Sequence, residues 1–493
     1  MLDADMLTRP VARNTTPAAS AVRTPPSPPW LGGLQDLSRD HGFEPLRVEG
    51  RLPGRLAGTL YRNGPGRFSA GGKRVPHWFD GDGAISSVRV EGGAALGAAR
   101  LVRTAGLERE ERAGKRLFGG YGTPLARPFR ELILKDSKNA ANTSVLLWQG
   151  RLFATCEGGK PCEVDPESLA TLGESTLGGV VVGAFSAHPH YVASRRATYN
   201  FGLTHGASST QVDAYELPDQ GSPRRIASFP LEGVRANHDF VATDRYLVFA
   251  FAPQYVSLLN VLLRGKALIS SAAWKAAKGT EIVVVPIDRP SAIRRFRVDA
   301  FMLEHVVNAF ERGGEVVFDY THYPDSDALE RFIGGLTSGR VDAPLRAEVR
   351  RAVVDPERGT LRSEVILPRA VELPRVSPRV EGRSHRYGYY VRFAASTADA
   401  PFGALLKQDL ETGRVDTYEP GDRRYPGEGV FVPDPDGKAE DDGWLLSMVY
   451  DARSDRSHLA ILDARAIGDG PVATCHFDHA IPFGFHGAWA QRG

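Results

Sequence analysis

Short runs in which apolar and polar residues alternate recur along most of the chain. Many of them are rich in β-branched and aromatic residues, and Gly, Asp-Gly or Asn-Gly stands between them. This pattern is typical of antiparallel β-hairpins. The runs that predict strands most clearly are GTLYRNGPGRF, AISSVRVEGG, RLFATCEGG, ATYNFGL, RYLVFAF, EIVVVPI, GEVVFDY, WLLSMVY and HLAILDA.

Long amphipathic helices are scarce in this sequence. The better candidates are LERFIGGL (329–336) and DAPLRAEVRRAVV (342–354). A third apolar stretch, YVSLLNVLLRGKALISSAAW (255–274), is interrupted by Arg264 and Lys266, so it does not predict a membrane span. It predicts either a helix of the core or an apolar patch that dips into a bilayer surface.

The β pattern continues to the C-terminus without a linker-like break. We therefore predict an all-β fold, a closed β-propeller that forms a single domain over residues 30–493. Residues 1–29 are rich in Pro, Ala and Thr and predict a flexible leader. Seven blades would average about 70 residues, longer than common propeller repeats. No internal repeat is visible, so periodicity does not give the number of blades.

Composition narrows the class of protein. The 61 Lys and Arg residues against 59 Asp and Glu residues give a net charge of +2, which argues against a nucleic-acid partner. Three cysteines, Cys156, Cys162 and Cys475, are too few for a disulfide framework, and no CxxC pair offers a thiolate zinc site. The N-terminal residues lack the apolar core of a signal peptide. These features predict a reducing, cytoplasmic compartment and imply no obligate protein partner.

Four of the 13 histidines stand in apolar or tightly turned contexts: His188 in FSAHPHY, His238 in RANHDF, His305 in MLEHVVNAF and His486 in PFGFHGAW. Their intervals are far longer than helical spacings, so each would have to reach a common point from a different strand. A propeller offers that geometry, because the innermost strand of every blade lines one axis. An all-histidine set suits a metal that performs redox or oxygen chemistry. Taken singly, each histidine is more often a hydrogen-bonded core residue, so the spacing alone leaves both interpretations open.

Three glutamates occupy similarly apolar, turn-rich settings: Glu157 in FATCEGGKP, Glu372 in AVELPRV and Glu428 in PGEGVFVP. A metal-bound histidine usually donates its second ring N–H to a carboxylate or a carbonyl. A buried glutamate must likewise find a partner. The three glutamates therefore fit one buried ligand shell, although exposed turn glutamates would give the same pattern.

At these residues the sequence resembles the carotenoid cleavage oxygenase family, which includes bacterial apocarotenoid oxygenases, lignostilbene dioxygenases and the retinal pigment epithelium isomerase. The resemblance runs from PLRVEGRLPGRL to the C-terminus and includes, in family order, HWFDGDGAISSVRV, SAHPH, HDFVATDRYLVF, HVVNAFE, EDDGWLLSMVYD and PFGFHGAW. It implies a seven-bladed propeller with a metal on its axis and a cap of loops and short helices over a substrate tunnel.

The resemblance also implies one Fe(II) per chain held by four histidines, three glutamates that orient ligands, and a threonine whose methyl group crowds an open iron position. By motif these are His188, His238, His305 and His486; Glu157, Glu372 and Glu428; and Thr143. The remaining histidines, His190 and His205 among them, match no ligand motif and are assigned to the surface or the core. Four neutral ligands leave the iron its 2+ charge and open positions for O2 as co-substrate.

The implied reaction is the O2-dependent cleavage of a conjugated C=C bond in a carotenoid or apocarotenoid, which gives aldehydes or ketones such as retinal. The substrate would be a lipophilic polyene that reaches the iron through an apolar tunnel. The segment 255–274 resembles the patch by which relatives approach membranes, so a peripheral membrane contact belongs to the prediction. No added organic cofactor is implied.

Several alternatives remain open at this point. Stilbene cleavage is opposed by Cys156, which stands where the stilbene cleavers carry a lysine, yet Tyr121 matches their tyrosine. Glu304 stands where relatives often carry Phe, and it could contact a polar substrate end or point outward as an inert strand residue. An isomerohydrolase that consumes no O2 and a non-catalytic propeller that binds a lipophile are the more distant alternatives.

Overall fold

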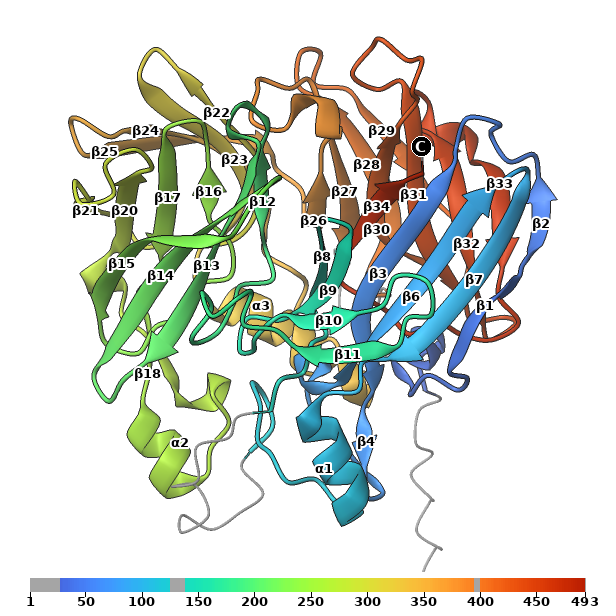
Figure 1. The fold of residues 1–493 in the computed structure, drawn as a ribbon, viewed down its shortest axis with the longest axis horizontal. Coiled ribbons are helices and arrows are strands. Elements are labelled where there is room, and N and C mark those ends of the chain that lie inside the picture. The colour runs from blue at the N-terminus through green and yellow to red at the C-terminus, as the bar shows by residue number, and fades with distance from the viewer. Residues whose placement is uncertain (1–26, 125–137, 394–399, 493) are drawn as a thin grey trace, which may run out of the picture.

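The strands of the chain close into a ring of seven sheets (Figure 1). This computed structural model describes residues 27–124, 138–393 and 400–492. Each sheet is one antiparallel blade of four or five strands, as the sequence predicts for a propeller. Most of the expected leader, residues 1–26, lies outside the described residues.

From the axis outward, the first blade contains β34 (Gly487–Gln491), β3 (Gly58–Arg67), β6 (Asp82–Glu91), β7 (Ala94–Leu101) and β1 (His41–Pro45), and the second contains β8 (Ser144–Trp148), β9 (Arg151–Thr155), β10 (Cys162–Val164) and β11 (Thr171–Glu174). In the same order, the third blade contains β12 (His190–Val192), β13 (Ala197–His205), β14 (Ser209–Pro218) and β15 (Arg224–Glu232), the fourth contains β16 (Val241–Ala242), β17 (Tyr246–Phe251), β20 (Thr280–Pro286) and β21 (Arg294–Val298), and the fifth contains β22 (Met302–Arg312), β23 (Glu315–Tyr323), β24 (Glu348–Asp355) and β25 (Thr360–Leu367). The sixth blade contains β26 (Val371–Arg375), β27 (Tyr387–Phe393), β28 (Phe402–Asp409) and β29 (Val415–Tyr418), and the seventh contains β30 (Arg424–Pro433), β31 (Gly443–Asp451), β32 (Arg456–Asp463), β33 (Pro471–His476) and β2 (Arg47–Gly50). Two small hairpins stand apart from the blades: β4 (Ser69–Ala70) with β5 (Lys73–Arg74), and β18 (Gln254–Val256) with β19 (Ala272–Trp274).

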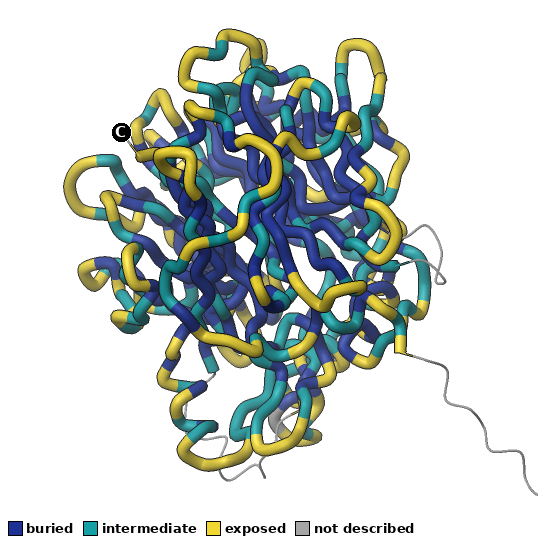
Figure 2. Tube along the Cα trace, turned by 90° about the vertical axis from the view of Figure 1, so that its right-hand side faces the viewer, coloured by how far each residue is buried: buried dark blue, intermediate teal, exposed yellow. Residues whose placement is uncertain are grey.

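The apolar core is divided into layers between neighbouring blades. One layer, for example, brings Phe201 and Val212 of the third blade against Phe249 and Val283 of the fourth. The strands are therefore buried along most of their length, while the loops at both rims are exposed (Figure 2). Because the blades pack against one another, the axis is left for polar side chains.

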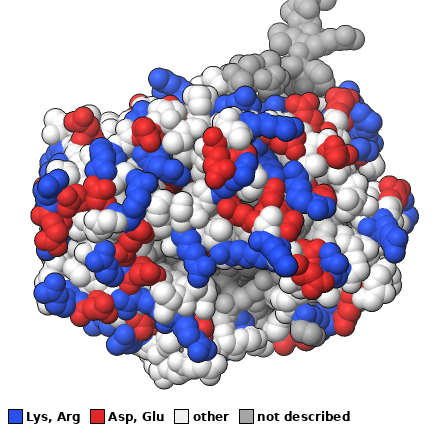
Figure 3. Space-filling view, turned by 90° about the horizontal axis from the view of Figure 1, so that it is seen from above, with Lys and Arg blue, Asp and Glu red and all other residues white. Residues whose placement is uncertain are grey.

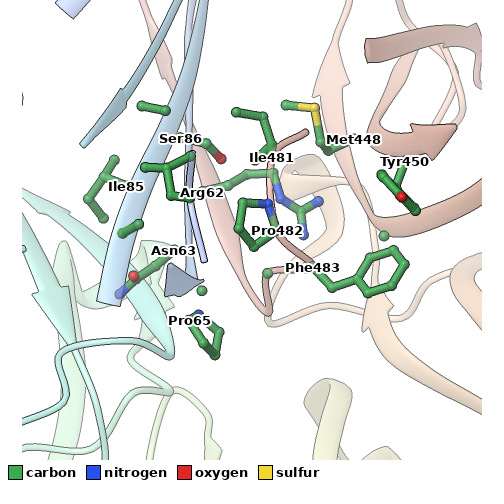
Figure 4. Close-up of a pocket in the computed structure, with 16 residues that line it drawn as sticks. Arg62, Asn63, Pro65, Ile85, Ser86, Met448, Tyr450, Ile481, Pro482 and Phe483 are labelled. Atoms are coloured by element: carbon green, nitrogen blue, oxygen red, sulfur yellow. The ribbon is translucent and has the colours of Figure 1, made fainter. Parts of the chain in front are cut away.

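Both ends of the described chain close the ring. β34 pairs with β3 in the first blade, and β2 pairs with β33 in the last. At this seam a Cβ atom on Gly64 would lie 2.2 Å from the Cα atom of Gly484, so neither position has room for a side chain. Figure 4 shows the small cavity beside the seam, about 20 Å³, into which Arg62 and Phe483 point.

All nine runs that predicted strands form strands, but one predicted helix is wrong. Residues 342–354 end in β24, which pairs with β23 on one side and β25 on the other. A register shift next to Val349 leaves Val349 and Ala352 both buried, and this spacing of three residues imitates a helical face. The other predicted helix, 329–336, forms α3 (Asp327–Ile333) and begins η7 (Leu336–Ser338).

The helices are short, and α1 (Ala105–Ala113) and α2 (Leu258–Arg264) project together from one side of the propeller (Figure 1). The remaining 3-10 helices are η1 (Pro29–Leu34), η2 (Trp78–Asp80), η4 (Ala193–Arg195), η5 (Ile269–Ser271), η6 (Ala276–Lys278), η8 (Pro378–Val380) and η9 (Ile467–Asp469). Leu259 and Leu263 of α2 are 65% and 57% exposed, so the stretch 255–274 does not contain a core helix. No helix among the described residues is long and apolar enough to cross a membrane.

The surface carries charges of both signs. On the face turned away from α1 and α2, Lys and Arg side chains are mixed with Asp and Glu side chains (Figure 3).

Candidate metal centre

Each of the seven innermost strands brings one polar side chain to the axis, from within the strand or from the residues just before it. In blade order these are His486, Thr143, His188, His238, His305, Glu372 and Glu428. Glu157 joins them from the loop that follows β9. The sequence predicted that the histidines would converge from different inner strands, and the structure brings all eight predicted residues to one place.

Three of these side chains lie at β-bulges. β26 and β30 each contain one extra residue relative to the strand beside them, next to Glu372 and at Glu428, and β22 contains two, one at His305 and one directly after Val306. A bulge bends the strand and turns a side chain away from its regular direction. Next to Glu372, Leu373 has a φ of 52°, and its N–H donates to Glu372 Oε2 at 3.1 Å. The bulges therefore aim these side chains at the axis.

One ring nitrogen from each of the four histidines lies within 4.8 Å of the other three. His305 Nε2 is 3.1 Å from His238 Nε2 and 3.2 Å from His486 Nε2. The Nδ1 atoms point outward to carboxylates: His305 Nδ1 to Glu372 at 2.5 Å, His486 Nδ1 to Glu428 at 2.9 Å and His238 Nδ1 to Glu157 at 2.8 Å.

This arrangement fits a metal ion. When Nδ1 donates its proton to a carboxylate, the Nε2 of the same neutral ring carries a lone pair. Lone pairs that face one another at about 3 Å repel unless a cation lies between them. His188 Nε2 is also buried, and no described residue forms a hydrogen bond with it. Four unsatisfied nitrogens that converge on one point form a donor set that a transition metal satisfies.

The electrostatics of the cluster favour positive charge at its centre. Burial lowers the pKa of His188 well below its usual range and lowers that of His486 to about 4, so both rings are neutral near pH 7. Burial also acts to lower the pKa of His238, but Glu304 and Glu157 overcome it and raise the value to about 10. Without a metal ion, these two carboxylates stabilise a proton on His238, and a bound metal ion would compete with that proton for the ring.

Two arginines support the Glu428 side of the cluster, the buried Arg62 and the half-buried Arg375. Arg375 Nε donates to Glu428 Oε1 at 2.8 Å, and Arg62 Nη1 donates to the Glu428 carbonyl at 2.8 Å. Burial acts to raise the pKa of Glu428, but the charges of Arg375 and His486 hold it well below its usual range. Sequence reasoning missed both arginines. The only signal for Arg62 was a lone cation in the otherwise apolar strand run GTLYRNGPG.

Tyr323 and Asp239 complete the support, and neither was predicted. The Tyr323 hydroxyl donates to Glu372 Oε1 at 2.6 Å. Asp239 accepts a hydrogen bond from the Val306 N–H at 2.7 Å. This bond links the residue after His238 to the residue after His305. His190 lies 2.7 Å from Asp239 through Nε2, so it supports the cluster indirectly and is neither a ligand nor a simple surface residue.

The histidine cluster opens into a cavity of about 440 Å³ under α3. Its walls are largely apolar, with Phe79, Phe332, Phe393 and Phe485 among the lining side chains. His205, assigned from sequence to the surface or the core, also lines this cavity. Such a volume, with a few polar groups at one place in its wall, is typical of a site for a small apolar molecule.

Thr143 and Cys156 lie in the cavity wall beside the cluster. Thr143 Oγ1 lies 3.3 Å from Glu157 Oε2 and donates to it. Burial raises the pKa of the Cys156 thiol to about 11, so it is a neutral, unreactive group. All three cysteines are buried and unpaired.

Tyr121 lines the same cavity, and its hydroxyl donates to Glu330 Oε1 at 2.7 Å. Glu304 also lines the cavity, with a side chain that is only 12% exposed. The alternative in which Glu304 points outward as an inert strand residue is therefore wrong. Its Oε1 lies 3.9 Å from His238 Nε2.

Comparisons with known proteins agree with this geometry. Residues 37–491 match the model of the family described as retinal pigment epithelial membrane protein. The chain is 34% identical over 476 residues to apocarotenoid-15,15'-oxygenase of Synechocystis sp., covering 94% of this chain and 96% of that protein. It is 29% identical over 487 residues to isoeugenol monooxygenase of Pseudomonas nitroreducens, and the match covers 94% of this chain and 98% of that protein. The solved structure of cobalt-substituted Synechocystis apocarotenoid oxygenase superposes on this chain with a TM-score of 0.86 at 33% sequence identity. The match covers 94% of this chain and 98% of that one.

Proposed function

The chain belongs to the retinal pigment epithelial membrane protein family of carotenoid oxygenases, and from this premise we propose that it is an Fe(II)-dependent oxygenase that cleaves a conjugated C=C bond of a carotenoid or apocarotenoid. O2 is the co-substrate, and the products are aldehydes or ketones such as retinal. The single observation that carries the proposal is the convergence of four histidine nitrogens in the wall of a largely apolar cavity. The seven blades act as one domain over residues 30–493.

His188, His238, His305 and His486 are the residues that would hold the metal ion. Bound Fe(II) supplies the redox chemistry by which O2 attacks a conjugated double bond. The residues of the chain do the rest: Glu157, Glu372 and Glu428 hold the Nδ1 protons of three rings, which keeps their Nε2 lone pairs directed inward.

The cavity wall binds the substrate and excludes water from the site. Its aromatic side chains offer a polyene the apolar contact that it lacks in water. The neutral Cys156 thiol adds no charge or nucleophile there. Thr143 stands beside Glu157, where its methyl group limits access to the centre, as the family resemblance implies. The proposed reaction needs no protein nucleophile.

We extend the proposal to a peripheral membrane contact through 255–274. Leu259, Leu263 and Leu268 are exposed on and after α2, and Arg264 and Lys266 lie between them. Apolar side chains interleaved with cations suit the boundary between acyl chains and anionic headgroups. Leu268 also lines the cavity, so the patch adjoins the space that a lipophilic substrate would occupy.

Cleavage of a phenolic side chain, as in a stilbene or isoeugenol, is the second candidate. The Tyr121–Glu330 pair favours it, because a tyrosine that donates to a carboxylate still has an oxygen lone pair for a phenolic O–H. The isoeugenol monooxygenase relative points the same way. Cys156, which offers a stilbene phenol no cation, weighs against it.

Metal content and O2 uptake on anaerobically purified protein test the proposal. An apocarotenal, a hydroxystilbene and isoeugenol are offered separately. We expect about one iron per chain and O2 uptake with the apocarotenal. Uptake with a phenolic substrate alone would establish the second candidate. Iron without uptake on any of the three would favour an isomerase, and a protein that takes up no iron on reconstitution would leave only a lipophile-binding propeller.

A further inference from the structure

One cation in the wall of the large cavity has no partner among the residues that the structure describes. Two Lys or Arg side chains are among the described residues that line this cavity, Arg116 and Lys138. Lys138 Nζ lies between two buried carboxylates, 2.6 Å from Asp82 Oδ1 and 2.7 Å from Glu110 Oε2. Arg116 is partly buried, and it forms no hydrogen bond or ion pair with any described residue. A cation beside an apolar cavity attracts an anionic ligand more strongly than a cation in water does, because its surroundings screen the charge less.

The backbone that carries Arg116 is fixed by the helix before it. Arg116 follows α1, and the buried Glu110 of that helix accepts from the N–H groups of Leu117 and Phe118 through Oε1, at 2.8 and 3.1 Å. The other oxygen of Glu110 accepts from Lys138. One buried carboxylate therefore holds both the Lys138 cation and the two residues after Arg116. The guanidinium extends into the cavity wall from a backbone that is already in place.

The same segment borders the mouth of the cavity. The N–H groups of Leu268 and Ile269 donate to the carbonyls of Gly120 and Tyr121, at 3.5 and 3.0 Å. Leu268 lines the cavity and is 40% exposed, so the cavity meets the surface there. The histidine cluster lines the same cavity from the inner strands. A long apolar molecule that reaches the histidines can therefore leave one end beside residues 116–121.

We propose that Arg116 binds the carboxylate of a polyene carboxylic acid, so that the preferred substrate carries a negative charge at the end that stays near the mouth of the cavity. The inference rests on the proposed function and names its substrate class. The Nη groups of Arg116, which no described residue engages, offer N–H donors that match the two oxygens of a carboxylate. An alcohol or an aldehyde offers one uncharged oxygen at the same position and gains less. With the carboxylate held at Arg116, the length of the polyene sets which double bond reaches the histidines.

The test compares the binding of two polyenes of equal length, an apocarotenoid carboxylic acid and the corresponding alcohol, to wild-type protein and to Arg116→Gln. Binding is measured without O2, and hence without turnover, by the quenching of tryptophan fluorescence, because Trp78 lines the cavity. We expect the wild type to prefer the acid by about 10-fold or more, Arg116→Gln to lose this preference with unchanged affinity for the alcohol, and Arg116→Lys to recover part of it. Arg112→Gln is the matched control, because Arg112 is exposed on α1 and lies outside the cavity wall, so its loss should change neither affinity.

The outcomes separate this inference from the proposed function. If Arg116→Gln binds the acid like the wild type, or loses affinity for the acid and the alcohol equally, Arg116 does not recognise the carboxylate and the inference is overturned. If Arg116→Gln keeps the preference for the acid but binds phosphatidylglycerol vesicles more weakly, the guanidinium contacts a lipid headgroup, and the inference is again overturned. Wild-type protein that prefers the acid through Arg116 but takes up neither iron nor O2 would confirm the carboxylate site and refute the proposed function.

Discussion

Each of three histidines donates a hydrogen bond from Nδ1 to a carboxylate, and the Nε2 lone pairs are thereby fixed toward one another. The consequence is sharpest at His305, whose Nε2 lies close to two other Nε2 atoms while its Nδ1 is held at 2.5 Å by Glu372. Replacing this ring removes a donor and also leaves the Glu372 carboxylate without its histidine.

We therefore expect His305→Ala to abolish iron retention and O2 uptake. Removing one of four histidine donors leaves the ion too few ligands to withstand dialysis. Metal analysis of dialysed protein measures the effect, and circular dichroism confirms that the propeller still folds. Full iron occupancy with wild-type turnover in this variant would refute the assignment of His305 as a ligand.

Glu157 and Glu428 likewise accept a hydrogen bond from a histidine Nδ1, but they differ in burial. The Glu157 side chain is 36% exposed, whereas Glu428 is fully buried and also bonded to Arg375. We expect Glu157→Gln to weaken iron affinity by about 10- to 100-fold with little change in the free energy of unfolding. Glu428→Gln should in addition lose about 1–3 kcal/mol of stability, because the neutral amide removes the negative charge that faces Arg375 and the buried Arg62. Metal titration and urea unfolding of both variants measure the contrast, and equal stability losses would contradict it.

The sequence predicted the residues that touch the proposed metal better than those that support them. His486 in PFGFHGAW and Glu428 in PGEGVFVP carry local signals, since each is a polar residue in an apolar turn. Asp239 and Arg375 act through groups on other blades, the Val306 N–H and the Glu428 carboxylate. Those contacts depend on which blades are neighbours, and no local pattern encodes that.

At the scale of elements, strand pairing determined whether residues 342–354 form a helix or a strand, which the local sequence pattern did not. Residues 342–354 carry apolar residues at helical spacing, yet β24 has strands on both sides that satisfy its backbone groups. Burial between two strands outweighs the modest helix preference of Arg and Ala. In residues 255–274 a helix did form, as α2, but Leu259 and Leu263 on it are exposed, so it is not a helix of the core.

That exposure makes α2 testable as a membrane contact. We expect the double variant Leu259→Ser/Leu263→Ser to lose most of its binding to anionic lipid vesicles, because two apolar side chains would no longer leave water on binding. Co-sedimentation with phosphatidylglycerol vesicles measures it. Leu172→Ser is the matched control, since Leu172 is 63% exposed on β11, outside the α2 patch. Equal binding by wild-type protein and the double variant would remove α2 from the proposal.

At the scale of the whole molecule, the centre is finished only when the ring closes. His486 is the last of the four proposed ligands in sequence, and it stands directly before β34, the strand that pairs with β3 across the seam. The Asn63 N–H donates to the His486 carbonyl at 2.9 Å, and the Phe485 N–H donates to the Asn63 carbonyl at 2.9 Å. Arg62, which lines the seam cavity in Figure 4, reaches the Glu428 and Phe485 carbonyls. Closure of the propeller and placement of the fourth histidine of the cluster are thus one structural event.

Gly64 tests this coupling between closure and the site. A methyl group at Gly64 would meet the Cα atom of Gly484 at 2.2 Å, and because that atom is backbone the strands must separate. We expect Gly64→Ala to lower the free energy of unfolding by about 1–3 kcal/mol, the usual cost of overpacking. It should also weaken metal binding, since the shifted segment carries His486.

Gly54→Ala is the control for Gly64→Ala, because no atom lies within 4 Å of the position that its Cβ would take. Urea unfolding and Co(II) titration of the two variants measure stability and metal affinity separately. If Gly64→Ala loses stability but binds Co(II) like the wild type, His486 is positioned by its own blade and does not depend on the seam. If both variants match the wild type in both measurements, the two strands are not in close contact in solution, and closure of the ring at Gly64 and Gly484 is refuted.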